Sequence, residues 1–430
     1  MLGLIGMLVA LALLVILAMR GWNILLIAIV CSAVVALTNG MNLYETLLDS
    51  YMLGYVGFFK SWFMMFLAGA LFGKLMEKTR GAETIANIIV KKLGGSKAVL
   101  AIVISCAVLA YGGVSIFVIG FTIYPIAVSL FKEANLPRKF LPGAIGFGTV
   151  TFAMTSPGTP QIQNVIQSIT LGTDTMSGAI VGIIAGIFMF IVGMWWLNNA
   201  IRKDVAKGGC FHEFAEEKEA SEEGGDLPAP LVAFIPLIVT IVGLNVLKLK
   251  PEVSITISLL VGILALSKHL NMKELSNLFG DGASGAIAAI ANTCAVVGFG
   301  SVVKSVPAFD ILIDAVTHIP GPPLVGAAIA VTVVCGITGS ASGGLGIAIP
   351  IVGPIYMAMG VPAAAIHRVT AIASGALDSL PHNGYIVTLL NICKTSHRDG
   401  YMPLFWLTVV LPAVACLLAI GLFQLFPNWV

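Results

Sequence analysis

The sequence predicts an all-α polytopic membrane protein with two inverted-topology repeats, about ten transmembrane helices, two re-entrant hairpins and two broken helices. Three observations support this prediction. The composition is too apolar for a water-soluble domain, long apolar segments recur from one end of the chain to the other, and the same order of glycine and proline signals occurs twice.

The composition places most of the chain out of contact with water. Of the 430 residues, 58% are hydrophobic and only 10% are charged, whereas about a quarter of the residues in a soluble domain are charged. Apolar segments of roughly 18 residues or more, enough to cross a hydrocarbon core of about 30 Å, recur throughout. The first of them, residues 1–19, has no basic leader and no small-residue cleavage pattern, so we expect it to remain as a span.

The cysteine and charge patterns exclude several other classes of protein. The seven cysteines are scattered singly, without the close pairs that build zinc or redox sites, so no cofactor or metal is expected. The formal net charge is +2, and the basic residues form no stripe of the kind that binds nucleic acid. We therefore expect the protein to contact the lipid bilayer and not to bind nucleic acid.

Two apolar stretches are interrupted by glycine-rich centres. Residues about 97–131 contain Gly112 and Gly113 between two short apolar arms, and residues about 322–359 contain the run from Gly339 to Gly344. Several of these arms are too short to cross a membrane alone, so each stretch is predicted to be a re-entrant hairpin. Such hairpins are tolerated only where the irregular tip is buried in protein or lines a water-filled cavity.

Proline spacing relates the two halves of the chain. Pro125 and Pro137 follow the first hairpin, Pro350 and Pro362 follow the second, and one offset of 225 residues relates both pairs. Hairpin, proline pair and broken apolar arm thus recur in the same order. This recurrence predicts an internal repeat.

Each half also contains an apolar arm that a polar, proline-containing stretch breaks. The first broken helix is predicted at about 139–170, with the break at 155–161, and the second at about 363–393, with the break at 378–384. Discontinuous helices in inverted repeats indicate a binding site near the bilayer midplane.

The predicted domains are a first inverted repeat at 1–200, a cytoplasmic acidic linker at 201–228 and a second inverted repeat at 229–430. If each hairpin enters and leaves on one face, the first half has five crossings, and the second half begins on the opposite side. Most of the 23 basic residues then fall in loops on one side. Because Lys and Arg accumulate in cytoplasmic loops, both termini are predicted to lie outside, and Arg368 falls in an outer loop.

An ionisable residue lies inside the second broken helix. Asp378 falls well within an apolar arm and next to the break, which is a costly position that indicates function. His382 follows four positions later. Pro381 removes a backbone donor and Gly384 permits unusual dihedral angles, so the helix is expected to unwind here. The second half-helix would begin near Asn383 and present its N-terminal amides to an anion.

Small polar side chains and glycines complete the predicted site. Because Lys and Arg occur in the apolar arms only at segment ends, we expect an anion to be held by amides, hydroxyls and helix-dipole ends. The predicted proton-coupling residues are Asp378 and His382. The predicted substrate-binding residues are Ser115, Thr155, Ser156, Gly158, Thr159, Gln161, Asn164, Ser340, Ser342, Gly343, Gly344, Ser379, His382 and Asn383.

Structural roles stay open for these residues. Ser and Thr in membrane helices often bond their own backbone or join helices, and Asp378 and His382 are also candidates for fixed partners of each other. His367, at the end of a span, is predicted to be an ordinary interfacial histidine. The run Gly282-Ala283-Ser284-Gly285 matches the G-x-S-G pattern of intramembrane serine proteases, but its small residues equally suit close helix packing.

Two motifs in the second half resemble those of a known family. The runs from Gly339 to Gly346 and from Ala376 to Gly384 are similar to the gluconate permease (gluconate:proton symporter) family of the wider ion transporter superfamily, and the likeness covers nearly the whole chain. It implies proton-coupled uptake of hydroxy-carboxylates in a bacterial inner membrane, by a scaffold domain that is often dimeric and a transport domain of hairpins and broken helices. Carried over by position, it points to Ser340–Gly344, Asp378, Ser379, His382 and Asn383.

The first broken helix departs from this family, because it has no histidine between its prolines where gluconate permeases have one. A smaller acid such as 3-hydroxybutyrate or lactate is therefore as plausible a substrate as gluconate. We expect a proton-coupled symporter for a small organic anion, acting as a homodimer. The alternatives are a sodium-coupled carrier of di- or tricarboxylates, a passive channel and an intramembrane protease.

Overall fold

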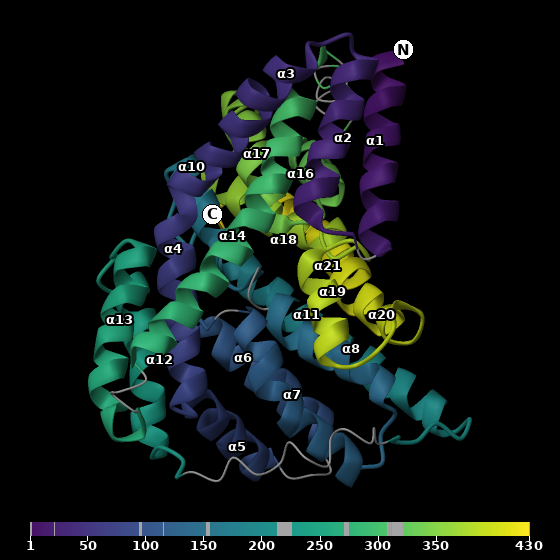
Figure 1. Ribbon diagram of the computed structural model, residues 1–430. Helices are drawn as coiled ribbons and strands as arrows, with labels where there is room; N and C mark the ends of the chain where they lie inside the picture. Colours follow the sequence, from purple (N-terminus) through teal and green to yellow (C-terminus); the bar gives the residue numbers. More distant parts are fainter. Residues whose placement is uncertain are drawn as a thin grey trace.

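The computed structural model describes residues 2–20, 22–93, 97–114, 116–151, 155–212, 226–270, 275–307, 309, 311 and 321–429. In this part of the chain the regular elements are helices (Figure 1). The helices of the first half are α1 (Leu2–Met19), α2 (Ile24–Thr38), α3 (Leu43–Glu45), α4 (Met52–Lys78), α5 (Gly81–Leu93), α6 (Ala98–Tyr111), α7 (Ile116–Glu133), α8 (Leu141–Gly146), α10 (Ile162–Leu171) and α11 (Ala179–Val205). Those of the second half are α12 (Pro230–Asn245), α13 (Pro251–Ala265), α14 (Leu275–Lys304), α16 (Pro323–Thr338), α17 (Ala341–Ala358), α18 (Ala363–Leu377), α19 (Gly384–Ile392), α20 (His397–Phe405) and α21 (Leu411–Leu425).

Several helices are long and apolar enough to cross a membrane. The described residues contain five such segments, together with shorter apolar helices. Along α11, Ile183, Ile187, Ile191 and Trp195 recur every four residues and are exposed, as contact with lipid requires. The fold is therefore that of a multi-pass membrane protein. The five segments are Leu43–Lys78, Ala179–Val205, Leu275–Lys304, Ala341–Ala358 and His397–Leu425.

Helices of the two halves pack on each other in a reciprocal pattern. Helix α2 packs on α14 and α13 packs on α4, while α4 and α14 pack along each other. Likewise, α10 contacts α17, and α19 contacts α7. The offset of 225 residues also places α7, Ile116–Glu133, on α17, Ala341–Ala358. Such an exchange of partners is expected of two related halves, and both the repeat and its opposite orientation in the membrane stay predictions.

The two glycine-rich centres are sharp turns between packed helices. Gly113, between α6 and α7, has a φ of +93°, and Gly339, between α16 and α17, has a φ of +56°. Glycine adopts both values without steric cost. Figure 1 shows α6 and α7 in the lower half of the molecule and α16 and α17 in the upper half. Their tips meet at one cavity.

Regular helix is interrupted at both predicted breaks. In the first half, turns and extended backbone precede the start of α10 at Ile162, and residues 152–154 lie outside the described residues. In the second half, α18 ends at Leu377 and α19 begins at Gly384. The Asn383 side chain caps α19 by accepting from the N–H of Tyr385 at 2.7 Å, a role for which asparagine is among the preferred residues.

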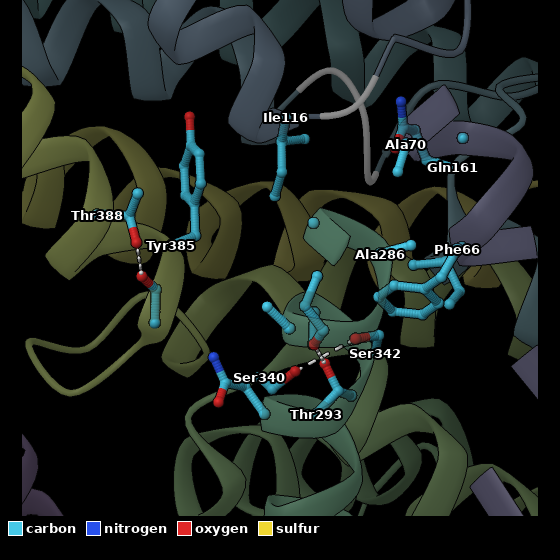
Figure 2. Close-up of a pocket in the computed structure, with 18 of the residues that line it drawn as sticks. Phe66, Ala70, Ile116, Gln161, Ala286, Thr293, Ser340, Ser342, Tyr385 and Thr388 are labelled. Carbon is cyan, nitrogen blue, oxygen red and sulfur yellow. Dashed lines mark hydrogen bonds between the residues drawn. The ribbon is translucent and has the colours of Figure 1, made fainter. Parts of the chain in front are cut away.

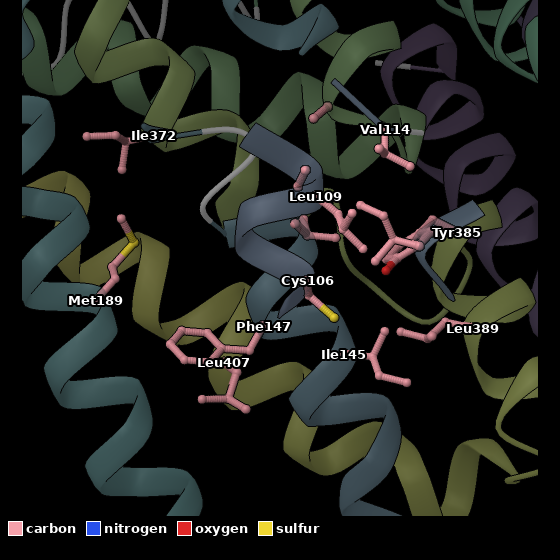
Figure 3. Close-up of a cluster of buried hydrophobic side chains, with 14 of the residues drawn as sticks. Cys106, Leu109, Val114, Ile145, Phe147, Met189, Ile372, Tyr385, Leu389 and Leu407 are labelled. Carbon is pink, nitrogen blue, oxygen red and sulfur yellow. The ribbon is translucent and has the colours of Figure 1, made fainter. Parts of the chain in front are cut away.

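A buried apolar cluster packs the first hairpin against both broken helices (Figure 3). It includes Cys106 of α6, Phe147 of the first broken helix and Leu389 of α19. A Cβ atom at Gly148 would lie only 2.5 Å from the carbonyl oxygen of Val103. The absence of a side chain there allows the first broken helix to lie directly on α6.

The predicted acidic linker, residues 201–228, is helical at its start because α11 continues to Val205. The Lys139 ammonium lies 2.5 Å from the Asp204 carboxylate and joins this end of α11 to the first broken helix. Residues 213–225 of the linker lie outside the described residues.

Candidate functional site

A cavity of about 520 Å³ lies where the hairpin tips and the helix breaks meet (Figure 2). The long helices α4 and α14 form a further wall, with Phe66, Ala70, Ala286 and Thr293. A cavity of this size fits a small organic molecule. The tips and breaks contribute Gly113, Ile116, Pro160, Gln161, Thr338–Ser342, Asp378, Ser379 and His382–Tyr385.

The predicted site residues divide into two groups. The residues that line the cavity are Gln161, Ser340, Ser342, Asp378, Ser379, His382 and Asn383. Those that do not are Thr155, Ser156, Gly158, Thr159, Asn164, Gly343 and Gly344. Ser115 lies outside the described residues.

Four helices begin at the cavity. The first residues of α7, α10, α17 and α19, which are Ile116, Ile162, Ala341 and Gly384, all line it. The N-terminus of a helix carries unsatisfied N–H groups and the equivalent of about half a positive charge. Each of these ends contributes a partial positive charge to the cavity wall.

The N-terminus of α10 is more open than those of α17 and α19. Its N-cap residue, Gln161, makes no side-chain capping bond, because its amide donates to the Ala110 carbonyl at 2.7 Å instead. Ile162 and Gln163, the first two residues of the helix, line the cavity. By contrast, the Ser340 side chain caps α17 and the Asn383 side chain caps α19. The amides of α10 are thus better placed to bind an anionic oxygen than those of α17 and α19.

One basic side chain, Lys74, occurs among the described lining residues. Its ammonium lies 2.7 Å from the Glu77 carboxylate, which also lines the cavity. A cation neutralised by an adjacent acid contributes little further attraction for an anion. Asp281 and Asp378 also line the cavity, so beyond the paired Lys74 the helix ends are the positive groups available to an anion there.

Asp378 is a buried acid on the cavity wall, with only 4% of its surface exposed. Its carboxylate accepts from the Ser379 hydroxyl at 2.9 Å and interacts with the Ala341 N–H at the start of α17. The Asn383 amide donates to the Asp378 backbone carbonyl at 2.9 Å. In the described part of the chain, no Lys or Arg forms an ion pair with Asp378. A carboxyl group placed in this way can gain or lose a proton without breaking a salt bridge.

His382 lies beside the second hairpin tip. Its Nε2 is 3.1 Å from the carbonyl oxygen of Gly336 near the end of α16. The Cδ2 edge of the ring lies so close to Gly339 that a Cβ there would be 2.3 Å from it. The His382 ring therefore connects the second helix break to the second hairpin.

Gly339→Ala is expected to lower the initial rate of uptake by more than about tenfold, since it adds strain of about 1–3 kcal/mol and displaces the His382 ring. The measurement is uptake by reconstituted protein. Gly360→Ala is the matched control, because Gly360 also has a positive φ, +85°, but has nothing within 4 Å of the added Cβ. An equal loss in both variants would show that backbone strain, and not the ring contact, is responsible.

The prediction from the sequence was wrong for two residues. Arg368 was expected in an outer loop, and His367 was expected at the membrane interface. Both are fully buried in α18. The Arg368 guanidinium donates to the carbonyls of Thr155 at 3.1 Å, Thr175 at 3.0 Å and Ser177 at 2.8 Å. These acceptors belong to the first half, so the charge is satisfied by groups that lie far away in the sequence.

Polar residues of the first break form a buried hydrogen-bonded cluster around Arg368. They are Thr155, Thr159 and Asn164. Asn164 donates to the Thr159 hydroxyl at 2.8 Å and accepts from Arg368 at 3.2 Å. His367 Nδ1 lies 2.8 Å from the Thr173 hydroxyl. Thr159, Asn164 and Thr155 are buried away from the cavity and bond one another or Arg368. In this structure they join the two halves of the chain.

The sequence contains a signal for the burial of Arg368. The residue lies within the apolar arm of residues 363–377, where an ionisable side chain indicates a buried partner or a function. The wall formed by α14, including Asn292 and Thr293, carried no such signal, because single polar residues in a long helix are common. On that helix, Gly282 packs against Leu71, and a Cβ there would lie 2.8 Å from the Leu71 side chain. Gly282 of the G-x-S-G run thus serves close packing of α4 and α14, whereas an added Cβ at Gly285 would have nothing within 4 Å.

The fold and the cavity define a class of protein, a multi-pass membrane transporter. Residues 2–383 match the family model described as GntP family permease. The chain therefore belongs to the GntP permease family, which confirms the resemblance to gluconate permeases.

Two relatives cover most of the chain. The "Uncharacterized transporter YxjC" of Bacillus subtilis (strain 168) is 35% identical over 455 residues, which cover 95% of this chain and 96% of that protein. An "Uncharacterized transporter" of Haemophilus influenzae is 22% identical over 324 residues, which cover 74% of each chain. Both relatives are described as transporters.

Proposed function

We propose that the protein is a secondary active symporter that takes up a small organic anion together with a proton. The substrate class is a hydroxy-monocarboxylate, either gluconate-like or short-chain, such as 3-hydroxybutyrate or lactate. The observation that carries this proposal is the convergence of four helix N-termini on one cavity that also contains the buried carboxyl group of Asp378.

The substrate carboxylate binds at the open N-terminus of α10. The amides of Ile162 and Gln163 supply hydrogen-bond donors, and the helix dipole supplies a favourable potential. The other three helix ends extend this potential across the cavity. The small residues at the second hairpin tip, from Gly339 to Ser342, leave room for the remainder of the acid.

Protonation of Asp378 couples the anion to a proton. A substrate carboxylate in the cavity would meet a second negative charge if Asp378 were ionised, and two like charges in a poorly solvated site disfavour each other. Tyr401 and Cys335, titratable groups within electrostatic range of Asp378, provide no positive charge to relieve this repulsion. The anion and the proton therefore bind best together. His382 is the other candidate proton carrier.

A sodium-coupled carrier of a di- or tricarboxylate is the alternative. Such a carrier would use backbone carbonyls near the hairpin tips, such as those of Thr338 and Gly339, as oxygen ligands. Family membership supports a permease and not an intramembrane protease. We also propose a homodimer in the bacterial cytoplasmic membrane, with both termini outside.

Counterflow in proteoliposomes tests the carrier proposal. Vesicles loaded with excess unlabelled gluconate, 3-hydroxybutyrate or lactate should transiently concentrate the same labelled acid, because a carrier exchanges substrate across the membrane. Flux should saturate with concentration. Unsaturable flux without counterflow would contradict the proposal and support a channel.

A further inference from the structure

We propose that His382 recognises the hydroxyl group of the substrate by accepting a hydrogen bond at Nδ1. This inference rests on the proposed function, and it assigns a specificity role to one residue of that site. It follows from the ring nitrogen that donates to the protein, the fixed orientation of the ring and the other ring nitrogen, which has no partner among the described residues.

The contact with Gly336 determines which ring nitrogen carries the proton. Nε2 of His382 lies 3.1 Å from the Gly336 carbonyl oxygen, and a carbonyl oxygen can only accept a hydrogen bond. Nε2 must therefore be the donor. In the neutral ring Nδ1 then has a lone pair and acts as an acceptor.

The surroundings hold the ring in this orientation. A flip of the ring would exchange Nε2 with Cε1 and so lose the bond to Gly336. The Cδ2 edge lies against Gly339, at the left-handed turn of the second hairpin, where a Cβ atom would be 2.3 Å away. Two points of the second hairpin thus fix the ring, and Nδ1 is presented in a constant direction.

No described protein group satisfies Nδ1 of His382, although the atom is buried. The side chain has only 4% of its surface exposed and lines the cavity. A buried acceptor without a donor is unfavourable, and a ligand that supplies the donor removes this penalty.

Four other polar side chains on the cavity wall have partners in the protein. The hydroxyl oxygens of Ser340 and Ser342 lie 3.2 Å apart, and the Thr293 hydroxyl donates to the Ala289 carbonyl at 3.1 Å. The Gln161 amide donates to Ala110 at 2.7 Å. Unlike these groups, His382 Nδ1 has no partner among the described residues.

The chemistry of this partner follows directly. A substrate carboxylate is an acceptor and cannot satisfy a neutral Nδ1, whereas a hydroxyl group can donate to it. A site that leaves a polar group unpaired discriminates against the analogue that lacks the matching hydroxyl. The carboxylate at the α10 N-terminus and the hydroxyl at His382 then orient the acid at two points.

The test compares acids that differ only in the hydroxyl group. Binding of 3-hydroxybutyrate and butyrate, and of lactate and propionate, is measured by calorimetry on the purified full-length protein. Wild-type protein should bind the hydroxylated member at least about tenfold more tightly, the effect of one hydrogen bond to a buried acceptor. His382→Leu should bring this ratio close to one, and His382→Asn, which retains an acceptor, should recover part of it.

His212→Leu is the control, because His212 is exposed and far from this pocket lining, and it should keep the wild-type ratio. A wild-type ratio near one, or a ratio unchanged in His382→Leu, would overturn the inference. If His382→Leu binds neither acid, the ratio in His382→Asn decides, and a value below wild type but above one supports the role. Failure of every acid to bind to wild-type protein would instead contradict the proposed function.

Discussion

Asp378→Asn is expected to abolish proton-driven accumulation of the substrate while counterflow continues at a reduced rate. Asparagine has nearly the same shape, and its side-chain oxygen can still accept the Ser379 hydroxyl bond seen at 2.9 Å. It cannot bind or release a proton, however, so the charge of the site no longer changes during the cycle. Accumulation in proteoliposomes with an imposed proton gradient should therefore fall to the level without a gradient.

Asp49→Asn provides the matched control for this prediction. Asp49 is an exposed acid outside the cavity, so its replacement should leave accumulation unchanged. Normal proton-driven accumulation by Asp378→Asn would show that the coupling group lies elsewhere. His382 would then be the next residue to test.

Arg368→Gln is expected to destabilise the protein by about 3 kcal/mol or more, because each buried acceptor left without a donor costs about 1–3 kcal/mol. Arg368 donates to the carbonyls of Thr155, Thr175 and Ser177 and to the Asn164 side chain. Arg368→Lys should recover only part of this loss, since an ammonium cannot reproduce the planar array of donors. Unfolding of the purified protein in detergent measures the effect.

Lys248→Ala gives the comparison for Arg368. Lys248 pairs with Asp174 across the two halves, but the pair is exposed, with side-chain exposures of 56% and 43%. Exposed pairs of this kind contribute about 1 kcal/mol or less. A similar loss of stability in Lys248→Ala and Arg368→Gln would contradict the structural role assigned to the buried cluster.

Local signals in the sequence located the second half of the site. Gly339 predicted a sharp turn, Pro381 and Gly384 predicted a helix break, and Asp378 in an apolar arm predicted a buried functional acid. The structure places all of them at or next to one cavity. The turn, the break and the burial of Asp378 could be predicted because backbone geometry at glycine and proline, and the cost of burying a charge, are properties of the residues themselves, whereas the functional role of Asp378 stays a prediction.

The site residues of the first half could not be predicted from local signals in the sequence. Thr155, Thr159 and Asn164 have the polarity expected of ligand-binding residues, yet they surround Arg368 instead of the cavity. Their partner lies about 200 residues away in the sequence, and only the packing of the two halves brings it near. Whether a hydroxyl or amide binds a ligand or a buried charge depends on such tertiary contacts.

The most direct test of proton-coupled anion symport is accumulation of labelled 3-hydroxybutyrate, lactate and gluconate in proteoliposomes under a proton gradient or a sodium gradient. We expect that an inwardly directed proton gradient alone drives accumulation of at least one of these acids, and that a sodium gradient at constant pH does not. Accumulation that requires sodium, with no response to protons, would contradict the role of Asp378 and move the coupling site to the carbonyls of the hairpin tips.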